Sequence, residues 1–391
     1  MNPVALAVAA LVAALSIACR ADAQEPIKLG IIATYSGQFA DTAQQMDNGI
    51  KLYIKQHGDA VAGRKIEIIR RDSGGPNPDV AKRLAQELVV RDKVDILAGF
   101  PTSPEALAAA DVSAASQKFM VSMNGTASML TTKSPYVVRT SFTLPQVAQA
   151  LGAWAATKGG IKKAYTMVTD FGPGIDGEQY FQRGFKDNGG EIIGSVRTPL
   201  ANPDFAPFVQ RIKDANPESI FVFVPGGSQP AALGKAFAER GIDPNKIKIM
   251  SSGEAVDETA IKGLGELAIG RLSAQHYDYN HRSPKNEAFV KAYNAEFNRN
   301  PDFFSVGGFD GMHVIYAALT KTNGKADGDS LVQAAKGMQW ESPRGPMLID
   351  PETRDVVQTI YIRRVEKVDG KIVNVDIDKI DNVKDPVKAS K

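Results

Sequence analysis

Short hydrophobic runs alternate with longer amphipathic stretches along this chain. From Ile27 onward, runs rich in β-branched residues are separated by about 12 to 18 residues whose apolar positions recur at helical spacing. Continuous apolar strands joined by helices are typical of parallel sheets covered on both faces. The pattern therefore predicts an α/β protein, with strands at 27–35, 65–72, 94–100, 118–124, 162–170, 190–198, 219–226 and 246–253, and helices at 43–57, 77–91, 104–117, 174–188, 205–215 and 228–240.

The strand and helix pattern falls into two series, which predicts two doubly wound lobes rather than one long sheet. The last third departs from the alternation, because helices at 284–298 and 304–322 are followed by a two-stranded ribbon. A late helical block of this kind indicates that the chain returns to the first lobe and then crosses again. We therefore expect one lobe from residues 24–143 plus 275–345 and a second from 144–274 plus 346–391.

The first 23 residues have the pattern of a signal peptide. Val4–Ala18 is an uncharged apolar stretch, and the small residues at positions 21 and 23 predict cleavage after Ala23 and export to the periplasm. The alternative is a lipoprotein acylated at Cys19. It is disfavoured because Ser16 stands three residues before the cysteine, where a leucine is usual. Cleavage after Ala23 removes the single cysteine of the chain.

Composition and motifs exclude several classes of function. The net charge of +2 over 391 residues gives no basic stripe for nucleic acid. The chain lacks the G-x-S-x-G, H-E-x-x-H and G-x-x-x-x-G-K-[ST] motifs, and the spacing of His276 and His281 is not that of metal ligands. We therefore expect no enzymatic activity, no cofactor and no metal. An exported hydrolase with Ser103 or Ser228 as nucleophile is the alternative from another class.

Two loops of the first series carry hydroxyl groups at the ends of predicted strands, where open α/β sheets bind ligands. In "AGFPTSPEA", Ser103 is expected to be a helix N-cap, with Pro104 as the first helical residue and Glu105 near the positive end of the helix dipole. Such a helix start offers unpaired N–H groups to an anion. In "NGTASML", Thr126 or Ser128 could cap a second short helix.

The loops of the second series supply different chemistry. Phe171 lies in the stiff loop "DFGPGID", and Gly226 and Gly227 let the backbone of "PGGSQP" approach a ligand closely. Glu254 follows the strand predicted at 246–253 and offers a carboxylate. A first lobe that binds a negative group and a second lobe with a carboxylate and an aromatic wall suit an α-amino acid.

Together these segments give the chain a recognisable likeness. It resembles the periplasmic substrate-binding proteins of branched-chain amino acid importers of the ABC type, through "IKLGIIATYSGQFA", "GFPTSPEALAAADV", "MVSMNGTASML", "DFGPGID", "VPGGSQPAALGKAFAERG" and "FVKAYNAEFNRNPDFFSVGGFDGMHVIYAAL". The likeness covers nearly the whole mature sequence. It implies a type I periplasmic-binding fold, in which two doubly wound parallel-sheet lobes are joined by a three-segment hinge and close on the ligand.

The resemblance also implies roles for particular residues. The ligand carboxylate would be held by Ser103, Asn124 and Thr126, the ammonium group by Glu254, and the side chain by Phe171. Two departures affect selectivity: Thr42 stands where relatives often carry an aromatic residue, and "DFG" replaces the common "DYG". The candidate ligand-binding residues are Phe39, Thr42, Thr102, Ser103, Asn124, Thr126, Phe171, Gly226, Gly227 and Glu254.

The leading hypothesis is a monomeric periplasmic receptor for a small carboxylate, in particular an apolar or branched-chain amino acid, that delivers its ligand to an ABC permease in the inner membrane. The alternative within the same fold is an aromatic carboxylate of the benzoate or cinnamate type, which needs no partner for an ammonium group.

Overall fold

The computed structural model describes residues 25–244 and 246–388. The predicted signal peptide, its cleavage after Ala23 and the alternative acylation at Cys19 lie outside these residues. Within them, none of the helices combines the length and the apolar character that a membrane crossing requires.

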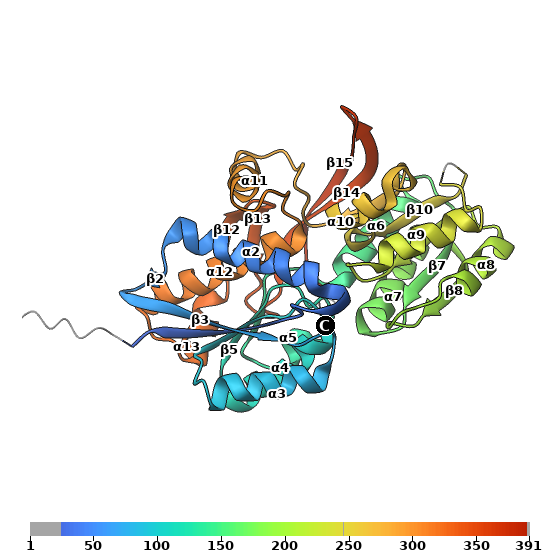
Figure 1. Cartoon of the computed structure of the whole chain (residues 1–391). Helices are drawn as coiled ribbons and strands as arrows, with labels where there is room; N and C mark the ends of the chain where they lie inside the picture. The colour runs from blue at the N-terminus through green and yellow to red at the C-terminus, as the bar shows by residue number, and fades with distance from the viewer. Residues whose placement is uncertain (1–24, 245, 389–391) are drawn as a thin grey trace, which may run out of the picture.

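The first lobe is built on a six-stranded sheet in the order β2-β3-β1-β4-β5-β6, parallel except for the short edge strand β2. Helices α3 and α4 cover one face, and α2 covers the other (Figure 1). Strands β4 and β5 are buried along their whole length, which explains their continuous apolar sequence. The elements are β1 (Ile27–Ala33), η1 (Gly37–Phe39), α2 (Ala40–His57), β2 (Ala60–Val61), β3 (Arg64–Asp72), α3 (Pro78–Val90), β4 (Ile96–Gly99), α4 (Ser103–Ser116), β5 (Phe119–Ser122), α5 (Leu130–Lys133) and β6 (Val137–Arg139).

The second lobe is built on a nine-stranded sheet in the order β12-β13-β14-β11-β10-β9-β7-β8, with β15 paired to β14. Helices α6 and α7 pack on one face, and α8 and α9 on the other. The elements of this lobe are α6 (Leu144–Ala156), β7 (Lys163–Thr169), α7 (Gly172–Lys186), β8 (Glu191–Thr198), α8 (Ala206–Ala215), β9 (Ser219–Phe223), α9 (Gln229–Glu239), β10 (Lys248–Ser252), η2 (Gly253–Val256), α10 (Glu258–Leu264), η3 (Gly265–Ala268), β11 (Leu272–Gln275), β12 (Gln339–Ser342), β13 (Gly345–Ile349), β14 (Val356–Val368) and β15 (Lys371–Val383).

The late helices α11 (Pro284–Phe297), α12 (Phe303–Lys321) and α13 (Gly328–Ala335) return to the first lobe (Figure 1). Glycine permits a close approach of α12 to α2: a Cβ atom on Gly49 would lie 1.9 Å from the carbonyl oxygen of Ser305. The chain thus passes between the lobes after β6, after β11 and after α13. The α/β class and the two-lobe architecture are confirmed, while the boundaries expected at residues 143, 274 and 345 stay predictions.

Several strands end earlier than the hydrophobic pattern indicates. The strand expected over 219–226 ends at Phe223, and the one expected over 118–124 ends at Ser122. In both cases the apolar character continues past the last paired residue, because the chain stays buried where the lobes meet. The loops that follow these strand ends contribute residues to the site.

Candidate functional site

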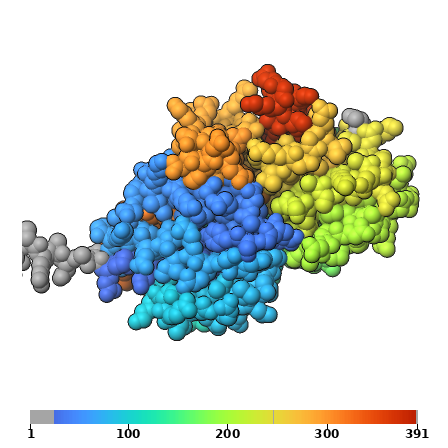
Figure 2. Space-filling model, viewed as in Figure 1, coloured from blue at the N-terminus to red at the C-terminus, as the bar shows by residue number. Residues whose placement is uncertain are grey.

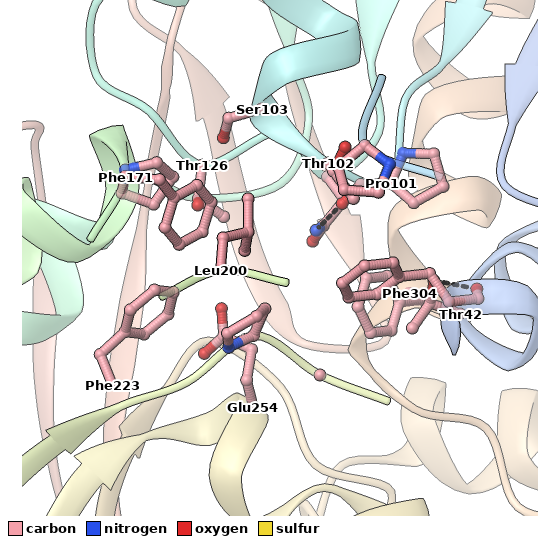
Figure 3. Close-up of a pocket in the computed structure, with 16 residues that line it drawn as sticks. Thr42, Pro101, Thr102, Ser103, Thr126, Phe171, Leu200, Phe223, Glu254 and Phe304 are labelled. Atoms are coloured by element: carbon pink, nitrogen blue, oxygen red, sulfur yellow. Dashed lines mark hydrogen bonds between the residues drawn. The ribbon is translucent and has the colours of Figure 1, made fainter. Parts of the chain in front are cut away.

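A pocket lies between the carboxyl ends of the two sheets (Figure 3), at the place where the two lobes touch (Figure 2). All of the predicted site residues except Gly227 line it. The lining consists of Phe39, Thr42, Pro76, Pro101, Thr102, Ser103, Asn124, Thr126, Phe171, Pro173, Leu200, Phe223, Pro225, Gly226, Glu254 and Phe304.

The start of α4 differs from the prediction. Thr102, not Ser103, is the N-cap residue, and Ser103 is already helical. The N–H group of Thr102 lies 3.3 Å from the Oε2 atom of Glu105, and its hydroxyl donates to the same atom at 2.5 Å. Thr102 and Glu105 are three residues apart, which is the spacing of a capping box. The side chain of Glu105 therefore closes back on the N-cap residue Thr102.

Glu105 is buried beneath this turn and also accepts a hydrogen bond from the hydroxyl of Ser73. Burial raises the pKa of Glu105 to about 7, although its hydrogen bonds act in the opposite direction. Glu105 bonds the N-cap residue Thr102. Its pKa of about 7 means that its carboxyl group is only partly ionised at neutral pH.

Because Thr102 serves as the cap, Ser103 is available for another role. Its hydroxyl oxygen accepts a hydrogen bond of 3.0 Å from the backbone N–H of Ala127, so its own proton can be donated elsewhere. The side-chain amide of Asn124 donates to the carbonyl of Pro101 at 2.7 Å, while its Oδ1 atom is buried without a partner in the described structure. Together with Thr126, these residues place polar atoms at one end of the cavity (Figure 3).

Glu254 lies at the opposite end of the cavity, on η2 directly after β10, with its carboxyl group directed into the space (Figure 3). Only 4% of the residue is exposed, and its Oε2 atom has no hydrogen-bond partner among the described residues. Burial raises the pKa of Glu254 to about 7, and the positive charge of Arg363 offsets only part of this effect. Burial therefore moves the titration of this carboxyl group into the neutral pH range.

Aromatic side chains form the walls between these two ends. Phe171 stacks on Phe223 with ring centroids 5.9 Å apart and planes 21° from parallel. Phe304, at the start of α12, lies across the cavity, next to Thr42 in Figure 3. The hydroxyl of Thr42 donates to the carbonyl of Phe39 at 2.7 Å, so it serves the start of α2.

Sequence reasoning missed Phe223, Leu200, Phe304 and the prolines of the lining. Phe223 could have been found, because it stands near the carboxyl end of a predicted strand, where ligands are expected. Phe304 could not, since it comes from the late helical block, and only the folded chain brings that block to the cavity.

The two glycines of the "PGG" turn have different positions. Gly226 lines the cavity, and a Cβ atom there would lie 3.4 Å from the ring of Phe304. Gly227 has a φ of +96°, and a Cβ atom on it would lie 2.7 Å from the carbonyl oxygen of Gln38 in the first lobe. Gly227 was predicted to bind the ligand, but it is not among the lining residues. It lies where the two lobes approach each other closely.

The cavity lacks the groups of a hydrolase and of a metal site within the described residues. No histidine belongs to its lining, and Ser103 is bonded to a backbone N–H. No cluster of three or more His, Cys, Asp or Glu side chains is arranged to hold a metal ion in the part of the chain that the structure describes. The arrangement can enclose a small ligand with one polar end, an apolar body and a second polar end.

Two sheet-based lobes with a pocket between them are the architecture of a solute-binding protein. The family model described as "Periplasmic binding protein" matches residues 26–371, and the chain belongs to this family. The resemblance inferred from the sequence is thereby confirmed.

Three similar proteins specify the class further. A solute-binding protein of an ABC transporter from Rhodopseudomonas palustris BisB5, solved with 3,4-dihydroxybenzoic acid, is 52% identical with a TM-score of 0.89, covering 93% of this chain and 99% of that one. A counterpart from strain HaA2, solved with p-hydroxybenzoic acid, is 40% identical with a TM-score of 0.90, covering 94% and 100%. "Leu/Ile/Val-binding protein homolog 6" of Brucella melitensis biotype 1 is 41% identical over 378 residues, 96% of each chain.

These findings make the protein a periplasmic solute-binding protein of an ABC transporter, a class that binds small molecules and works with a permease. Membership of the family implies a periplasmic location.

Proposed function

We propose that this protein captures an aromatic carboxylate of the benzoate class between its lobes and delivers it to its ABC permease. The observation that carries the proposal is the buried Glu254, whose carboxyl group faces the hydroxyl end of a cavity walled by phenylalanine rings. Export with cleavage after Ala23 and a monomeric state complete the proposal.

The polar end of the first lobe suits the acid group of the ligand. The hydroxyls of Ser103 and Thr126 and the side chain of Asn124 lie together there, and charge-assisted hydrogen bonds of this kind contribute about 1.5–3 kcal/mol each. The aromatic ring would then occupy the space between the stacked pair Phe171 and Phe223 on one side and Phe304 on the other.

The far end distinguishes an aromatic acid from an amino acid. An α-amino acid brings an ammonium group, which requires the ionised form of Glu254, and burial opposes that form by raising the pKa of this carboxyl group to about 7. A neutral carboxyl group can donate or accept a hydrogen bond and suits an uncharged substituent on a ring. The two relatives solved with hydroxylated benzoic acids support this choice.

Binding would proceed by closure of the lobes around the ligand. Closure is favoured only to the extent that the ligand contacts the closed state better than the open one. The cavity draws its lining from both lobes, so a ligand bound in it makes contacts that exist only after closure.

A ligand screen tests the proposal. Benzoate, 4-hydroxybenzoate, 3,4-dihydroxybenzoate, cinnamate, leucine and valine are added separately, and thermal unfolding is followed. A ligand present at about 100 times its dissociation constant adds about 2.7 kcal/mol of stability. We expect the benzoates to raise the melting temperature and the amino acids to leave it unchanged. Stabilisation by leucine or valine alone would contradict the proposal.

A branched-chain amino acid is the second candidate, favoured by the position of Glu254 opposite the carboxylate end. Titration of Glu254→Gln separates the two. Affinity for 4-hydroxybenzoate should stay within about threefold of the original, since an amide replaces a neutral acid. Affinity for an amino acid should fall by about a hundredfold or more, because the ammonium group loses its charged partner.

A further inference from the structure

The turn that carries Thr126 is held from behind by a single arginine. Arg139, at the end of β6, is fully buried and donates to the carbonyl of Gly125, the residue before Thr126. It also donates to the carbonyl of Ala127, the residue after Thr126, at 2.6 Å. The guanidinium group therefore fixes the Gly125–Thr126 peptide and the Ala127–Ser128 peptide, one on each side of the Thr126–Ala127 peptide.

Fixing these planes determines where the N–H groups of the turn point. A trans peptide directs its N–H opposite to its carbonyl, so the N–H of Thr126 points away from Arg139. The Ala127–Ser128 peptide shows the same relation: the carbonyl of Ala127 accepts from Arg139, and the N–H of Ser128 lies 3.3 Å from the carboxylate of Asp176 in the second lobe.

Arg139 is itself anchored by Asp355, which directly precedes β14. Its Nε atom lies 2.8 Å from the Oδ1 atom of Asp355, and Asp355 is only 2% exposed. Asp355 also pairs with Lys388 near the end of the described chain. Removal of one partner from such a buried pair leaves a charge uncompensated, so the position of the guanidinium depends on Asp355.

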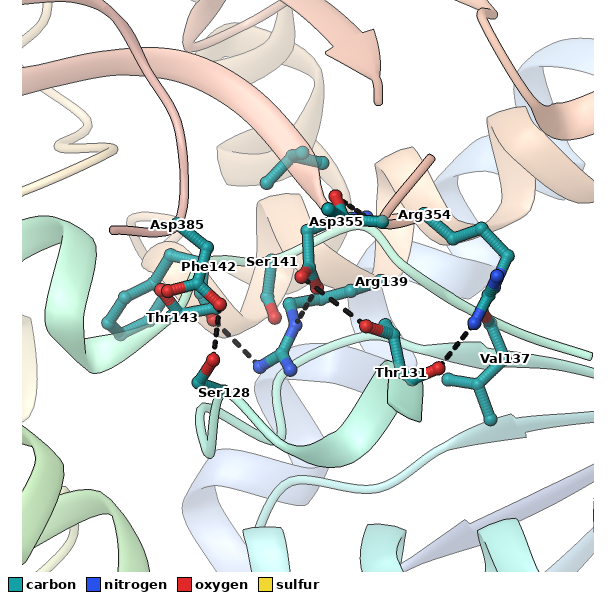
Figure 4. Close-up of polar contacts among 12 residues, drawn as sticks. Ser128, Thr131, Val137, Arg139, Ser141, Phe142, Thr143, Arg354, Asp355 and Asp385 are labelled. Carbon is teal, nitrogen blue, oxygen red and sulfur yellow. Dashed lines mark hydrogen bonds and ion pairs between the residues drawn. The ribbon is translucent and has the colours of Figure 1, made fainter. Parts of the chain in front are cut away.

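A second contact from the C-terminal segment reaches the same turn. Asp385 accepts a hydrogen bond from the hydroxyl of Ser128 (Figure 4). Lys388 donates to the hydroxyl of Thr131 at 2.7 Å. Asp355, just before β14, and the C-terminal segment 385–388 thus both contact the turn or the residues next to it.

We propose that Arg139, anchored by Asp355, is a positioning residue for ligand binding: it orients the Gly125–Ala127 peptides so that Thr126 meets the acid group of the ligand. This inference rests on the proposed function in one respect, the aromatic carboxylate. The network connects the turn of residues 125–127 to the residue that directly precedes β14.

The test compares an acid with its uncharged analogue. For Asp355→Asn, we expect the affinity for 4-hydroxybenzoate to fall by about tenfold or more, and the affinity for 4-hydroxybenzamide to change by less than about threefold. Asp378→Asn is the matched control, because Asp378 also forms an ion pair, with Lys158, but lies on β15 away from the turn. An equal loss for both ligands, or no loss for either, would overturn the proposal.

Two further measurements make the test independent of folding and of ligand identity. If Asp355→Asn does not fold, Arg139→Lys takes its place, since a lysine cannot hold both carbonyls, and the same selective loss is expected. Hydrogen exchange without ligand should be about tenfold faster at the amides of residues 126–128 than in the control. Unchanged exchange would refute the positioning role, whereas a wild-type protein that binds no benzoate would refute only the proposed function.

Discussion

The two ends of the pocket differ in how their buried polar groups are hydrogen-bonded. At the first-lobe end, Ser103 and Asn124 are engaged by backbone groups, and Arg139 holds the turn behind them. At the second-lobe end, Glu254 presents a carboxyl oxygen without a partner in the described structure. Asn124 also keeps its Oδ1 atom without a partner in the described structure, so the two ends differ in how many of their polar groups are already bonded. Affinity for an acid should therefore depend on the first end and selectivity on the second.

The largest expected effect tests the wall between the two ends. Phe223→Ala should lower the free energy of unfolding by about 3–5 kcal/mol, because a nearly buried ring is removed, and should abolish detectable binding of 4-hydroxybenzoate. Phe221→Ala is the matched control: this ring lies on the same strand and stacks on Phe181, outside the cavity lining. Denaturant unfolding and calorimetry should show a similar loss of stability for both variants and a loss of binding for Phe223→Ala alone.

The next effect sharpens the second-lobe end. An unfolded glutamate releases its proton near pH 4.5, whereas burial holds the pKa of Glu254 at about 7. The folded state therefore loses stability as pH rises from 4.5 to 7, and the full cost of the buried charge is present above pH 7. We expect Glu254→Gln to gain up to about 3 kcal/mol of stability over the original protein at pH 8 relative to pH 4.5.

Urea unfolding at the two pH values measures this difference. Glu239→Gln on the surface of α9 serves as the control and should show the same difference from the original protein at both pH values. A Glu254→Gln variant whose relative stability did not change with pH would show that the carboxyl group is ionised and solvated in the folded protein.

The third effect concerns the first-lobe end. Ser103→Ala and Thr126→Ala should each weaken the binding of 4-hydroxybenzoate by about tenfold, because each removes one charge-assisted hydrogen bond. Ser116→Ala, at the other end of α4, removes a hydroxyl that bonds only to the carbonyl of Val112 and should leave the affinity unchanged. Calorimetric titration that found full affinity in both site variants would place the acid group elsewhere.

The smallest expected effect concerns a hydrogen bond between the two lobes. Thr259 of α10 donates to Asp41 of α2 at 2.8 Å, and Asp41 also pairs with Arg299. Burial acts to raise the pKa of Asp41, but its hydrogen bonds to Arg299 and Thr259 lower it, so the carboxylate stays charged. Thr259→Val should cost the closed state about 0.5–1.5 kcal/mol, a loss of affinity of several-fold.

Titration against a Thr320→Val control checks this expectation, because the Thr320 hydroxyl donates within α12 and does not cross between the lobes. A larger loss for the control than for Thr259→Val would show that the contact between the lobes does not contribute to binding.

The sequence was sufficient to predict the α/β class, the two lobes and the loops that meet at the cavity. Alternation of apolar strands with helices is a local property, and the carboxyl ends of parallel strands share one edge. The boundaries were less accurate where strands enter the site: the strand expected over 94–100 is β4, Ile96–Gly99. Apolar residues beyond a strand end face the other lobe, and local hydrophobicity does not distinguish this burial from pairing in a sheet.

In the candidate site, too, contacts between residues close in sequence could be predicted, and contacts between distant residues could not. The capping role of Thr102 is readable from its spacing to Glu105, yet it was assigned to the neighbouring serine. The ion pair of Arg139 and Asp355 could not have been predicted, because the two residues are 216 positions apart in the sequence and come together only in the folded chain.

Gly227 has a practical consequence for the speed of release. The backbone there passes so close to Gln38 that a single methyl group would overlap the opposite lobe. Alanine at this position would oppose the last small approach of the two lobes. We therefore expect Gly227→Ala to shorten the residence time of a bound ligand, which makes this position a starting point for a sensor that releases its ligand quickly.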